Sequence, residues 1–487
     1  MLLTVAGVTG LGTVNVTASD LTDGTDNLSH REVFRARMPL TAGEKLPPSV
    51  DNSKNKYFPP VIDQLGGSCA QAAGIGYMFT YEMNRLLDRD ASASAENRMS
   101  YQFAWNLLNG GEDQGGFVGQ GLLLAKNYGI MNEADYGKHF LFKWVSGYEK
   151  YVRAMHNRAE TIYTYEDSVP LMKRYLYDAG DGSHVGGLLT FSGQTTGWVF
   201  DSHYEGPSLT GYHSLLTSLA TDGSHAMTIV GYDDTVSYTD SDGRCHEGAF
   251  IVVNSWGSWW QDKGHFYLPY DFFRDPTVKD IQLSSTVEGV RVTTYEPKVI
   301  LRLTVDYSSR NDLSYAVATS NDRDAKAPAS QHFVSDFGNV GGDLPMAGGV
   351  LGSRIEMAFD ITRQAQANPD ARKYFLNIFR SFSGRKKGEG QLVGLSAVDY
   401  RSGQPVEYLY RDTLPADLVD GYNYFGIPLV PRFTVPASPL RYTKADGHLT
   451  DETFLVRTAD GHHAKVQFTT PDVQGQTICI RYKKIED

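Results

Sequence analysis

Apolar residues recur along the first part of the chain with the spacing of an amphipathic helix. Between residues 71 and 87 they lie three or four positions apart, at Ile75, Met78, Phe79 and Met83, so they fall largely on one helical face. Three further segments are helix candidates: 101–108, 120–127 and 167–179. Short apolar runs typical of strands then follow: 186–192, 226–233 and 249–253. The pattern predicts a helical lobe and a second lobe built on an antiparallel sheet.

Beyond about residue 285 the pattern changes to short runs separated by Gly, Pro, Asp and Asn. Many of these runs alternate apolar and polar residues, as strands with one buried face do: 298–305, 354–360, 374–379, 391–398, 464–468 and 477–481. This favours an antiparallel β-sandwich of about 200 residues. Its tyrosines and the arginine-rich stretch 380–387 would suit a carbohydrate or protein partner, although exposed loops and core aromatics explain them equally well.

Composition restricts the classes of function. The chain has 487 residues, of which 41% are apolar, which suits two or three folded domains. Its net charge of -12 argues against a nucleic-acid partner, because binding to phosphates requires a basic surface. The sequence contains no run of about 20 apolar residues, so we expect no membrane span.

The candidate for chemistry in the first half is Cys69. It follows a Gly66-Gly67-Ser68 turn and opens the predicted helix, with Ser68 as its expected N-cap. At that position the free amides and the positive end of the helix dipole would stabilise a thiolate, and a neighbouring imidazolium would do so further. The alternative is that Cys69 is a small buried hydrophobe, the commonest role of a lone cysteine.

Two later residues complete the order Cys, His, Asn, which is that of a thiol nucleophile, its base and the group that orients the base. His225 opens one predicted strand and Asn254 ends the next, so neighbouring strands would bring an imidazole and a carboxamide together. Trp256 could shield that hydrogen bond from water. Taken singly, the histidine could be a polar strand cap and the Asn-Ser pair a turn.

The surrounding motifs resemble those of the papain-like cysteine peptidases. The stretch 61–70, Val-Ile-Asp-Gln-Leu-Gly-Gly-Ser-Cys-Ala, resembles the family's oxyanion-glutamine and nucleophile segment. Asn-Ser-Trp-Gly at 254–257, with Trp260 and Gly264 beyond it, resembles the block that carries the family's asparagine. Four shorter stretches resemble its N-terminal segment, its Leu-Ser-x-Gln stretch, its cleft glycines and the turn after them: 46–51, 99–102, Gly115-Gly116 and 128–130.

The resemblance implies an α+β fold: a two-lobed papain-like domain at 46–284, with a helical lobe and an antiparallel β lobe, followed by the β-sandwich domain at 285–487. It implies a cysteine endopeptidase that acts on protein or peptide substrates without a metal or cofactor. Cys69 would be the nucleophile, His225 the base and acid, Asn254 the orienting group, and Gln64 an oxyanion donor with the Cys69 amide. Six residues would contact the substrate: Gly115, Gly116, Ser224, Ala226, Trp256 and Trp260.

Several positions depart from the family pattern. Gln64 precedes Cys69 by five positions where the family has six, and Gln71 is a rival oxyanion donor. Gln261 stands where the family has a glycine, and the inserted hairpin 235–247 is expected near the cleft. Two other classes of function therefore stay open: a catalytically impaired binding or adhesion protein, and another acyl transferase or amidase on the same fold.

The remaining cysteines and the N-terminal segment are relevant to whether the protein is exported from the cell. Besides Cys69 the chain has only Cys245 and Cys479, which are either two free thiols or one disulfide. Residues 1–14 resemble the apolar part of a secretory signal and 16–18 a cleavage site, so we expect a bacterial, exported protein. The polar segment 19–45 is short for a folded inhibitory propeptide, so we expect none, and ordinary terminal disorder explains the segment.

Overall fold

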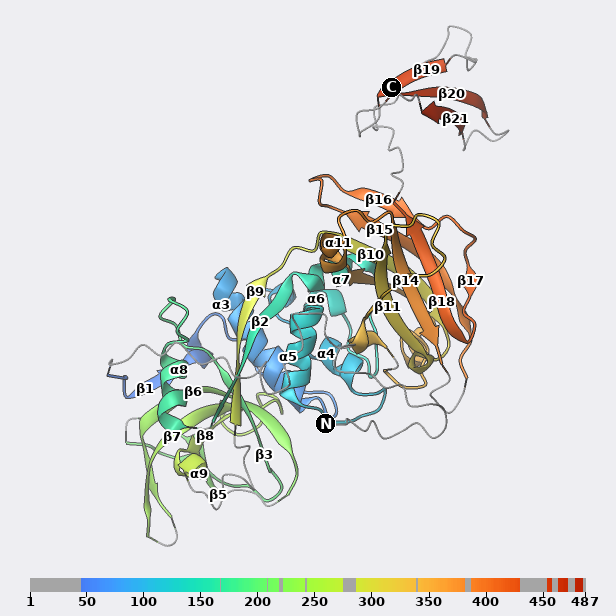
Figure 1. Ribbon diagram of the computed structural model, residues 1–487. Helices are drawn as coiled ribbons and strands as arrows, with labels where there is room; N and C mark the ends of the chain where they lie inside the picture. The colour runs from blue at the N-terminus through green and yellow to red at the C-terminus, as the bar shows by residue number, and fades with distance from the viewer. Residues whose placement is uncertain are drawn as a thin grey trace. The chain divides into compact units, whose positions relative to one another are not determined.

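The computed structural model describes most of the chain after residue 44. The described ranges are 45–166, 168–207, 209–218, 222–240, 243–274, 286–338, 340–381, 387–429, 453–457, 463–471 and 478–484. The signal-like segment predicted at the N-terminus lies outside them. Contacts divide the chain into two compact units, one formed by residues up to Pro405 with Leu409–Leu429, the other by Val406–Tyr408 with Val430–Asp487. The first unit mixes helices with several antiparallel sheets (Figure 1).

The predicted helix at 71–87, opened by Cys69, is confirmed. It begins at Cys69 as α2 (Cys69–Gln71), continues through the π-helical η2 (Ala72–Phe79) and ends as α3 (Thr80–Leu87). Asp88 adopts the left-handed conformation at its C-terminus. Every residue of η2 is buried. Wide π-helical turns of this kind occur frequently near functional sites.

The other helical segments of the first unit are short. The α-helices are α4 (Tyr101–Leu108), α5 (Val118–Asn127), α6 (Glu133–Tyr136), α7 (Tyr148–Met155), α8 (Val169–Tyr177), α9 (Asp271–Arg274) and α11 (Thr362–Ala367). The 3-10 turns are η1 (Asn52–Lys54), η3 (Ala95–Asn97), η4 (Arg310–Asp312), η5 (Ser335–Phe337) and η6 (Gly349–Leu351). None of the helices in the described part of the chain combines the length and the apolar composition that a bilayer crossing requires.

A nine-stranded sheet, counted over the described residues, forms the β lobe. Its order is β2-β9-β3-β6-β7-β8-β5-β4, with β1 also paired to β6. The strands are β1 (Ser49–Asp51), β2 (Asn157–Glu166), β3 (Leu189–Gly193), β4 (Val199–Tyr204), β5 (His213–Ser218), β6 (His225–Thr239), β7 (Cys245–Val253), β8 (His265–Pro269) and β9 (Thr286–Thr294). The two strands predicted to carry the histidine and the asparagine are the neighbours β6 and β7. Strand β9 follows the boundary predicted at 284, so the sheet extends into the next predicted domain.

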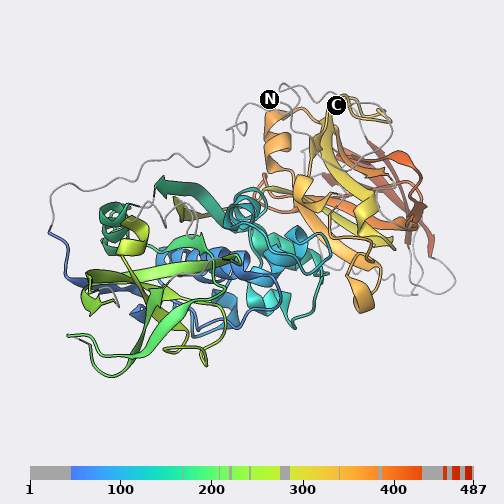
Figure 2. The ribbon, with the colours of Figure 1, turned by 90° about the horizontal axis from the view of Figure 1, so that it is seen from below.

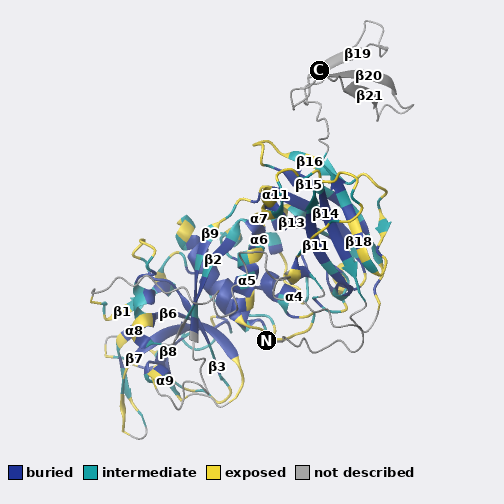
Figure 3. Cartoon of the chain, viewed as in Figure 1, coloured by how far each residue is buried: buried dark blue, intermediate teal, exposed yellow. Residues whose placement is uncertain are grey.

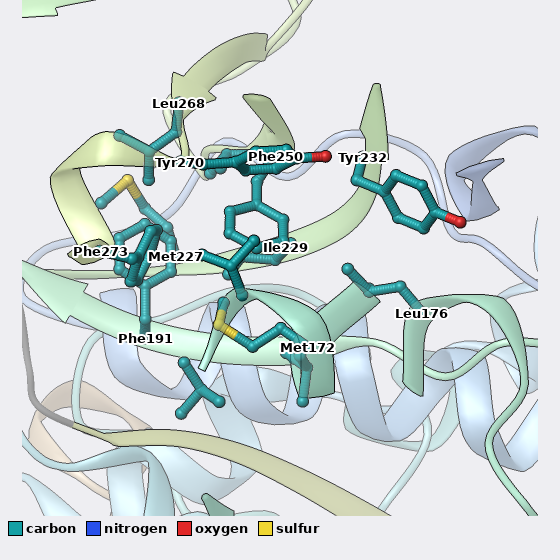
Figure 4. Packing of buried hydrophobic residues seen from close by; sticks show 14 of the residues in the cluster. Met172, Leu176, Phe191, Met227, Ile229, Tyr232, Phe250, Leu268, Tyr270 and Phe273 are labelled. Carbon is teal, nitrogen blue, oxygen red and sulfur yellow. The ribbon is translucent and has the colours of Figure 1, made fainter. Parts of the chain in front are cut away.

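One hydrophobic cluster holds β6 and β7 in place. Met172 and Leu176 of α8 lie over one face of the sheet, where they meet Ile229 and Phe250 (Figure 4). All four side chains are almost completely buried. Most of β6 is accordingly drawn in the colour of buried residues (Figure 3). Burial of each such side chain is worth about 1.5–3 kcal/mol relative to its exposure. The cluster therefore fixes the register of the two strands that present His225 and Asn254.

A partly buried carboxyl, that of Glu288 in β9, makes the stability of the folded chain depend on pH. Burial raises the pKa of Glu288 to about 7, against the opposing effect of the hydrogen bond that the Thr190 hydroxyl donates to it at 3.2 Å. The folded protein thus favours the protonated carboxyl. The pKa of Glu288 is higher in the folded chain than its unfolded value of about 4.3. The protonated carboxyl therefore contributes stability that is fully present below about pH 4 and is lost as pH rises through 7.

We expect Glu288→Gln to be more stable than the wild type by about 2–3 kcal/mol at pH 8, with little difference at pH 4. Denaturant unfolding of both proteins at several pH values measures this difference. Glu205→Gln is the matched control, because Glu205 is exposed and its replacement should leave the pH profile unchanged. The expectation is contradicted if the difference in unfolding free energy between the wild type and Glu288→Gln stays the same from pH 4 to pH 8.

The C-terminal half of the first unit contains two antiparallel sheets, as the alternating runs predict. One sheet places β13, β10 and β15 side by side with β17 at β15, and the other has the order β12-β11-β14-β18. Their bounds are β10 (Val299–Tyr307), β11 (Leu313–Ser320), β12 (His332–Phe333), β13 (Arg354–Asp360), β14 (Lys373–Arg380), β15 (Gly390–Asp399), β17 (Ala416–Asp417) and β18 (Gly421–Pro428). Strand β16 (Val406–Leu409) is divided between the units, since Val406–Tyr408 belongs to the second. Helices α4, α5, α6 and α7 lie between these sheets and the β lobe (Figures 1 and 2).

The second unit, taken by itself, is a small antiparallel sheet. The strands of this sheet are β19 (Thr453–Arg457), β20 (His463–Pro471) and β21 (Ile478–Lys484), in that order. The predicted strands 464–468 and 477–481 fall within β20 and at the start of β21. The side chain of Cys479 lies outside the described residues.

Candidate active site

Cys69 is the first residue of the helix, as the sequence predicts. Its thiol is free and partly exposed. Ser68 occupies the N-cap position, where its carbonyl accepts the Gln71 and Ala72 amides at 3.0 and 2.9 Å. The Ser68 hydroxyl, however, is buried and bonds to no described residue, so the expected side-chain cap is not formed. The position of the thiol therefore depends on the turn before the helix.

His225 and Asn254 form one buried pair at adjacent ends of β6 and β7. His225 Nε2 lies 2.7 Å from Asn254 Oδ1, and the two residues are 5% and 0% exposed. The same oxygen accepts the Ser255 amide at 2.7 Å, so Oδ1 is the acceptor and His225 Nε2 carries the proton. This tautomer leaves His225 Nδ1 as the unprotonated nitrogen.

Aromatic rings exclude water from this pair. Trp256 stacks on the imidazole with ring centres 4.7 Å apart, and Trp260 packs edge-on against Trp256 at 5.2 Å. Burial lowers the pKa of His225, while the bond to Asn254 opposes that shift. The neutral imidazole is therefore the favoured form until a negative charge develops beside it.

The segment before Cys69 runs alongside the segment after Asn254. The backbone N–H of Gln64 donates to the carbonyl oxygen of Ser255 at 2.8 Å, and the backbone N–H of Gly257 donates to the carbonyl oxygen of Ile62 at 2.9 Å. Residues 62–64 and 255–257 thus behave as two short antiparallel strands, although they are almost 200 positions apart in sequence. This pairing carries the turn that precedes Cys69 to the same place as the His225–Asn254 pair.

Two hydroxyl groups attach the helix itself to the sheet. Tyr77 in η2 donates to Asn254 O at 2.9 Å and accepts from the Ile62 amide at 2.7 Å. Thr228 in β6 donates to Ala73 O at 3.1 Å. The helix that begins at Cys69 is therefore fixed against both His225 and Asn254 from within the core.

Gln64 has a defined orientation beside the turn. Its Oε1 accepts from the Ser255 hydroxyl at 2.6 Å, and its Nε2 donates to Gly66 O at 2.8 Å. Gly66 has a φ of +60°, which lets the chain turn tightly between Gln64 and Cys69. An amide nitrogen carries two protons, so Nε2 retains one for a second acceptor.

The rival donor, Gln71, points elsewhere. Its side chain is 2% exposed, and its Nε2 donates to Phe117 O at 3.0 Å. Its Oε1 would lie only 1.8 Å from a Cβ placed on Gly121 of α5. Gln71 is therefore packed between two helices and does not present its amide at the surface where Cys69 is exposed.

The predicted cleft glycines lie against the turn that precedes Cys69. Gly115 and Gly116 are exposed in the loop between α4 and α5. A Cβ on Gly67 would come within 3.0 Å of Gln114 C and Gly115 N, so the two backbones touch. Asp113 accepts the Gly67 amide at 2.7 Å. Sequence reasoning missed Asp113, and its place two residues before the glycine pair was the available signal.

The other residues predicted to contact substrate differ in how exposed their side chains are. Ser224 is exposed directly before His225, but the Ala226 side chain is buried where β6 pairs with β3. Trp260 is partly buried in an aromatic cluster. The neighbouring Trp259, which sequence reasoning missed, is 75% exposed. Trp259 is thus the more accessible of the two rings.

Gln261 adopts a backbone conformation that is typical of glycine. Its φ is +47°, the left-handed conformation that favours glycine. Its Oε1 accepts from the Ser202 and Ser214 hydroxyls at 3.0 and 2.9 Å. These bonds hold a strained backbone that a glycine would adopt freely.

The inserted hairpin does not border the cleft, so that expectation is wrong. It is the continuation of β6 and β7, with Ser237 opposite Glu247 and Thr239 opposite Cys245. Since His225 begins β6, the hairpin lies at the far end of that strand (Figure 1). Cys245 there is exposed, and its thiol is free among the described residues.

No protein-family model and no curated protein matches the chain. Among solved structures, it is similar to xylellain, a cysteine protease from Xylella fastidiosa, with 20% identity over 52% of this chain and 87% of that one and a TM-score of 0.35. It is also similar to the proform of the ragweed cysteine protease Amb a 11 (17% identity, 54% and 72% covered, TM-score 0.34). A third is digestive procathepsin L 3 of Tenebrio molitor (18% identity, 52% and 73% covered, TM-score 0.36). These structural neighbours are papain-like cysteine proteases.

Proposed function

We propose that the protein is a cysteine endopeptidase that cleaves peptide bonds through an acyl-enzyme. The observation that carries this proposal is the buried His225–Asn254 pair, attached by 62–64 and by Tyr77 to the helix that Cys69 opens. A thiol at a helix start beside an oriented imidazole has the parts of an activated nucleophile. The Asn254 bond selects the tautomer in which Nδ1 can accept a proton.

In the proposed reaction, Cys69 transfers its proton to His225 Nδ1 and its sulfur attacks the scissile carbonyl carbon. The carbonyl π electrons move to oxygen, where the Cys69 amide and Gln64 Nε2 would donate hydrogen bonds. As the C–N bond breaks, the imidazolium protonates the leaving amine. Water then loses a proton to His225 and displaces the thiolate, which releases the carboxylic acid and restores the site.

Substrate binding would use the exposed loop on the other side of the turn. An extended peptide can hydrogen-bond to the backbone of Gly115 and Gly116 as a short additional strand. Glycines suit this role because no side chain prevents close approach of the substrate backbone. Ser224 and the accessible ring of Trp259 lie in the segments that precede His225 and follow Asn254, and they are the candidates for side-chain contacts.

Labelling tests whether an activated nucleophile exists. We expect a thiol-directed peptidyl epoxide to modify Cys69 stoichiometrically and Cys245 only slowly, with peptide mapping by mass spectrometry to locate the label. At neutral pH Cys69 should be alkylated faster than Cys245, because transfer of its proton to His225 gives a thiolate beside an imidazolium. Alkylation that stays slow until about pH 8.5, the value of a free thiol, would exclude the mechanism.

One observation favours a catalytically impaired binding protein instead. Gln64 Nε2 already donates to Gly66 O, so the expected oxyanion donor is partly engaged. That alternative predicts an unlabelled Cys69 and no turnover of any peptide mixture. Product analysis separates the third class, since an amidase or acyl transferase would leave internal peptide bonds intact.

The C-terminal sheets of the first unit are proposed to form an accessory β-sandwich. Its support is the ring contact between Tyr315 of β11 and Phe359 of β13, which belong to different sheets and lie 5.5 Å apart. Both side chains are buried. Two antiparallel sheets packed in this way are the defining feature of the architecture.

A further inference from the structure

Two pairs of glycines join the C-terminal sheets to the helical lobe. The Gly110–Gly111 turn follows α4, and the Gly341–Gly342 bend precedes β13; all four residues have positive φ. A Cβ on Gly111 would lie 2.2 Å from Gly341 O, and a Cβ on Gly342 would lie 2.7 Å from Gly110 O. The two backbones are therefore in direct contact, with no space for a side chain between them.

A buried arginine fixes the bend from the C-terminal side. Arg310 in η4 is 1% exposed and donates from Nε to Gly341 O at 2.8 Å and from Nη2 to Phe142 O at 2.9 Å. Its guanidinium lies over the Trp144 ring, 4.5 Å from the centre. Since Phe142 and Trp144 belong to the helical lobe, Arg310 holds the bend and that lobe together.

From Gly111 a compact loop leads to the candidate active site. The cleft loop, defined here as residues 112–116, is stabilised internally by a bond from the Gln114 amide to Glu112 O at 2.9 Å. The Trp105 indole donates to Gln114 O at 2.9 Å, which ties the loop to α4. Asp113 accepts the Gly67 amide two residues before Cys69. A displacement at Gly111 would thus reach both the turn at Gly67 and the glycine pair.

We propose that the Gly341–Gly342 bend is a positioning element for the active site. By its contact with Gly111 it fixes the cleft loop against the turn that precedes Cys69, and with it the substrate-binding glycines. The C-terminal sheets are then an integral part of the peptidase and not a detachable module. This inference rests on the proposed function for its catalytic consequence, but the mechanical coupling can be measured without turnover.

The chain offers a matched pair of substitutions. Gly110→Ala and Gly111→Ala impose similar strain, since φ is +66° and +77°, but a Cβ on Gly110 meets no described atom within 4 Å. We expect Gly111→Ala to lower kcat/KM roughly 100-fold relative to Gly110→Ala, because a misplacement of about 1 Å has that effect on a reacting geometry. Hydrogen exchange in the cleft loop should be faster in Gly111→Ala only, while circular dichroism shows both variants folded.

The outcomes separate this inference from the proposed function. A wild type without peptidase activity refutes the function, while faster exchange of the cleft loop in Gly111→Ala alone would still support the coupling. Equal exchange and equal kcat/KM in the two alanine variants would overturn the inference.

If Gly111→Ala does not fold, Gly342→Ala replaces it. Its control is Gly349→Ala, because Gly349 is exposed and a Cβ there meets no described atom within 4 Å. Equal exchange and kcat/KM in that second pair would overturn it as well.

Discussion

Cys69→Ala should abolish peptide hydrolysis while the free energy of unfolding stays within about 1 kcal/mol of the wild type. The thiol is partly exposed and bonds to no described side chain, so its loss removes little packing. The other described thiol cannot replace it, because Cys245 lies opposite Thr239, at the end of β6 that is far from His225. Turnover of a peptide library and denaturant unfolding of the same preparations measure the two quantities.

The matched control is Cys245→Ala, which removes the other described free thiol. We expect it to retain wild-type turnover and epoxide labelling. A Cys69→Ala protein that still cleaves peptides at a rate comparable to the wild type would show that the nucleophile lies elsewhere. Loss of activity in Cys245→Ala would contradict the separation of the hairpin from the cleft.

Gln64→Ala should lower kcat by roughly 100- to 1000-fold with little change in KM, as expected when one oxyanion donor is removed. The orientation of the amide supports this expectation, since the Ser255 hydroxyl holds Oε1 and thereby directs Nε2 toward the turn before Cys69. Steady-state kinetics on one peptide substrate measure both parameters.

Gln71→Ala is the corresponding control, and its effect should be of a different kind. Its side chain is buried and bonded to Phe117 O, so we expect a lower Tm and a kcat within a few-fold of the wild type. A larger loss of kcat in Gln71→Ala than in Gln64→Ala would reverse the assignment of the donor. Near-wild-type kcat in both would leave backbone amides as the only donors.

Local sequence signals were sufficient for the elements that carry the chemistry. The apolar spacing at 71–87 and the runs at 226–233 and 249–253 correspond to the continuous helix of α2, η2 and α3 and to strands β6 and β7. Such signals are reliable because each depends on residues a few positions apart. The order Cys, His, Asn is also a property of the sequence alone. The roles of those three residues stay predictions until the labelling and substitutions are done.

The positions of the site residues relative to one another were decided by the tertiary structure. Gln64 and Ser255, or Thr228 and Ala73, are more than 150 positions apart, and their bonds depend on how the lobes pack. For the same reason the sequence placed the 235–247 hairpin near the cleft, whereas its strands carry it away from His225. Periodicity describes which face of an element is buried, but it does not describe which element covers that face.

The sequence by itself determined the helix that begins at Cys69, the strand that begins at His225, the strand that ends directly before Asn254, and the β character of the C-terminal half. Only the tertiary structure decided that Asp113 holds the Gly67 turn and that Gly111 meets Gly341. Contacts between glycine backbones leave no hydrophobic or charge pattern in a sequence, because the feature that matters is the absence of a side chain. They become visible only when the two chain segments are brought together in space.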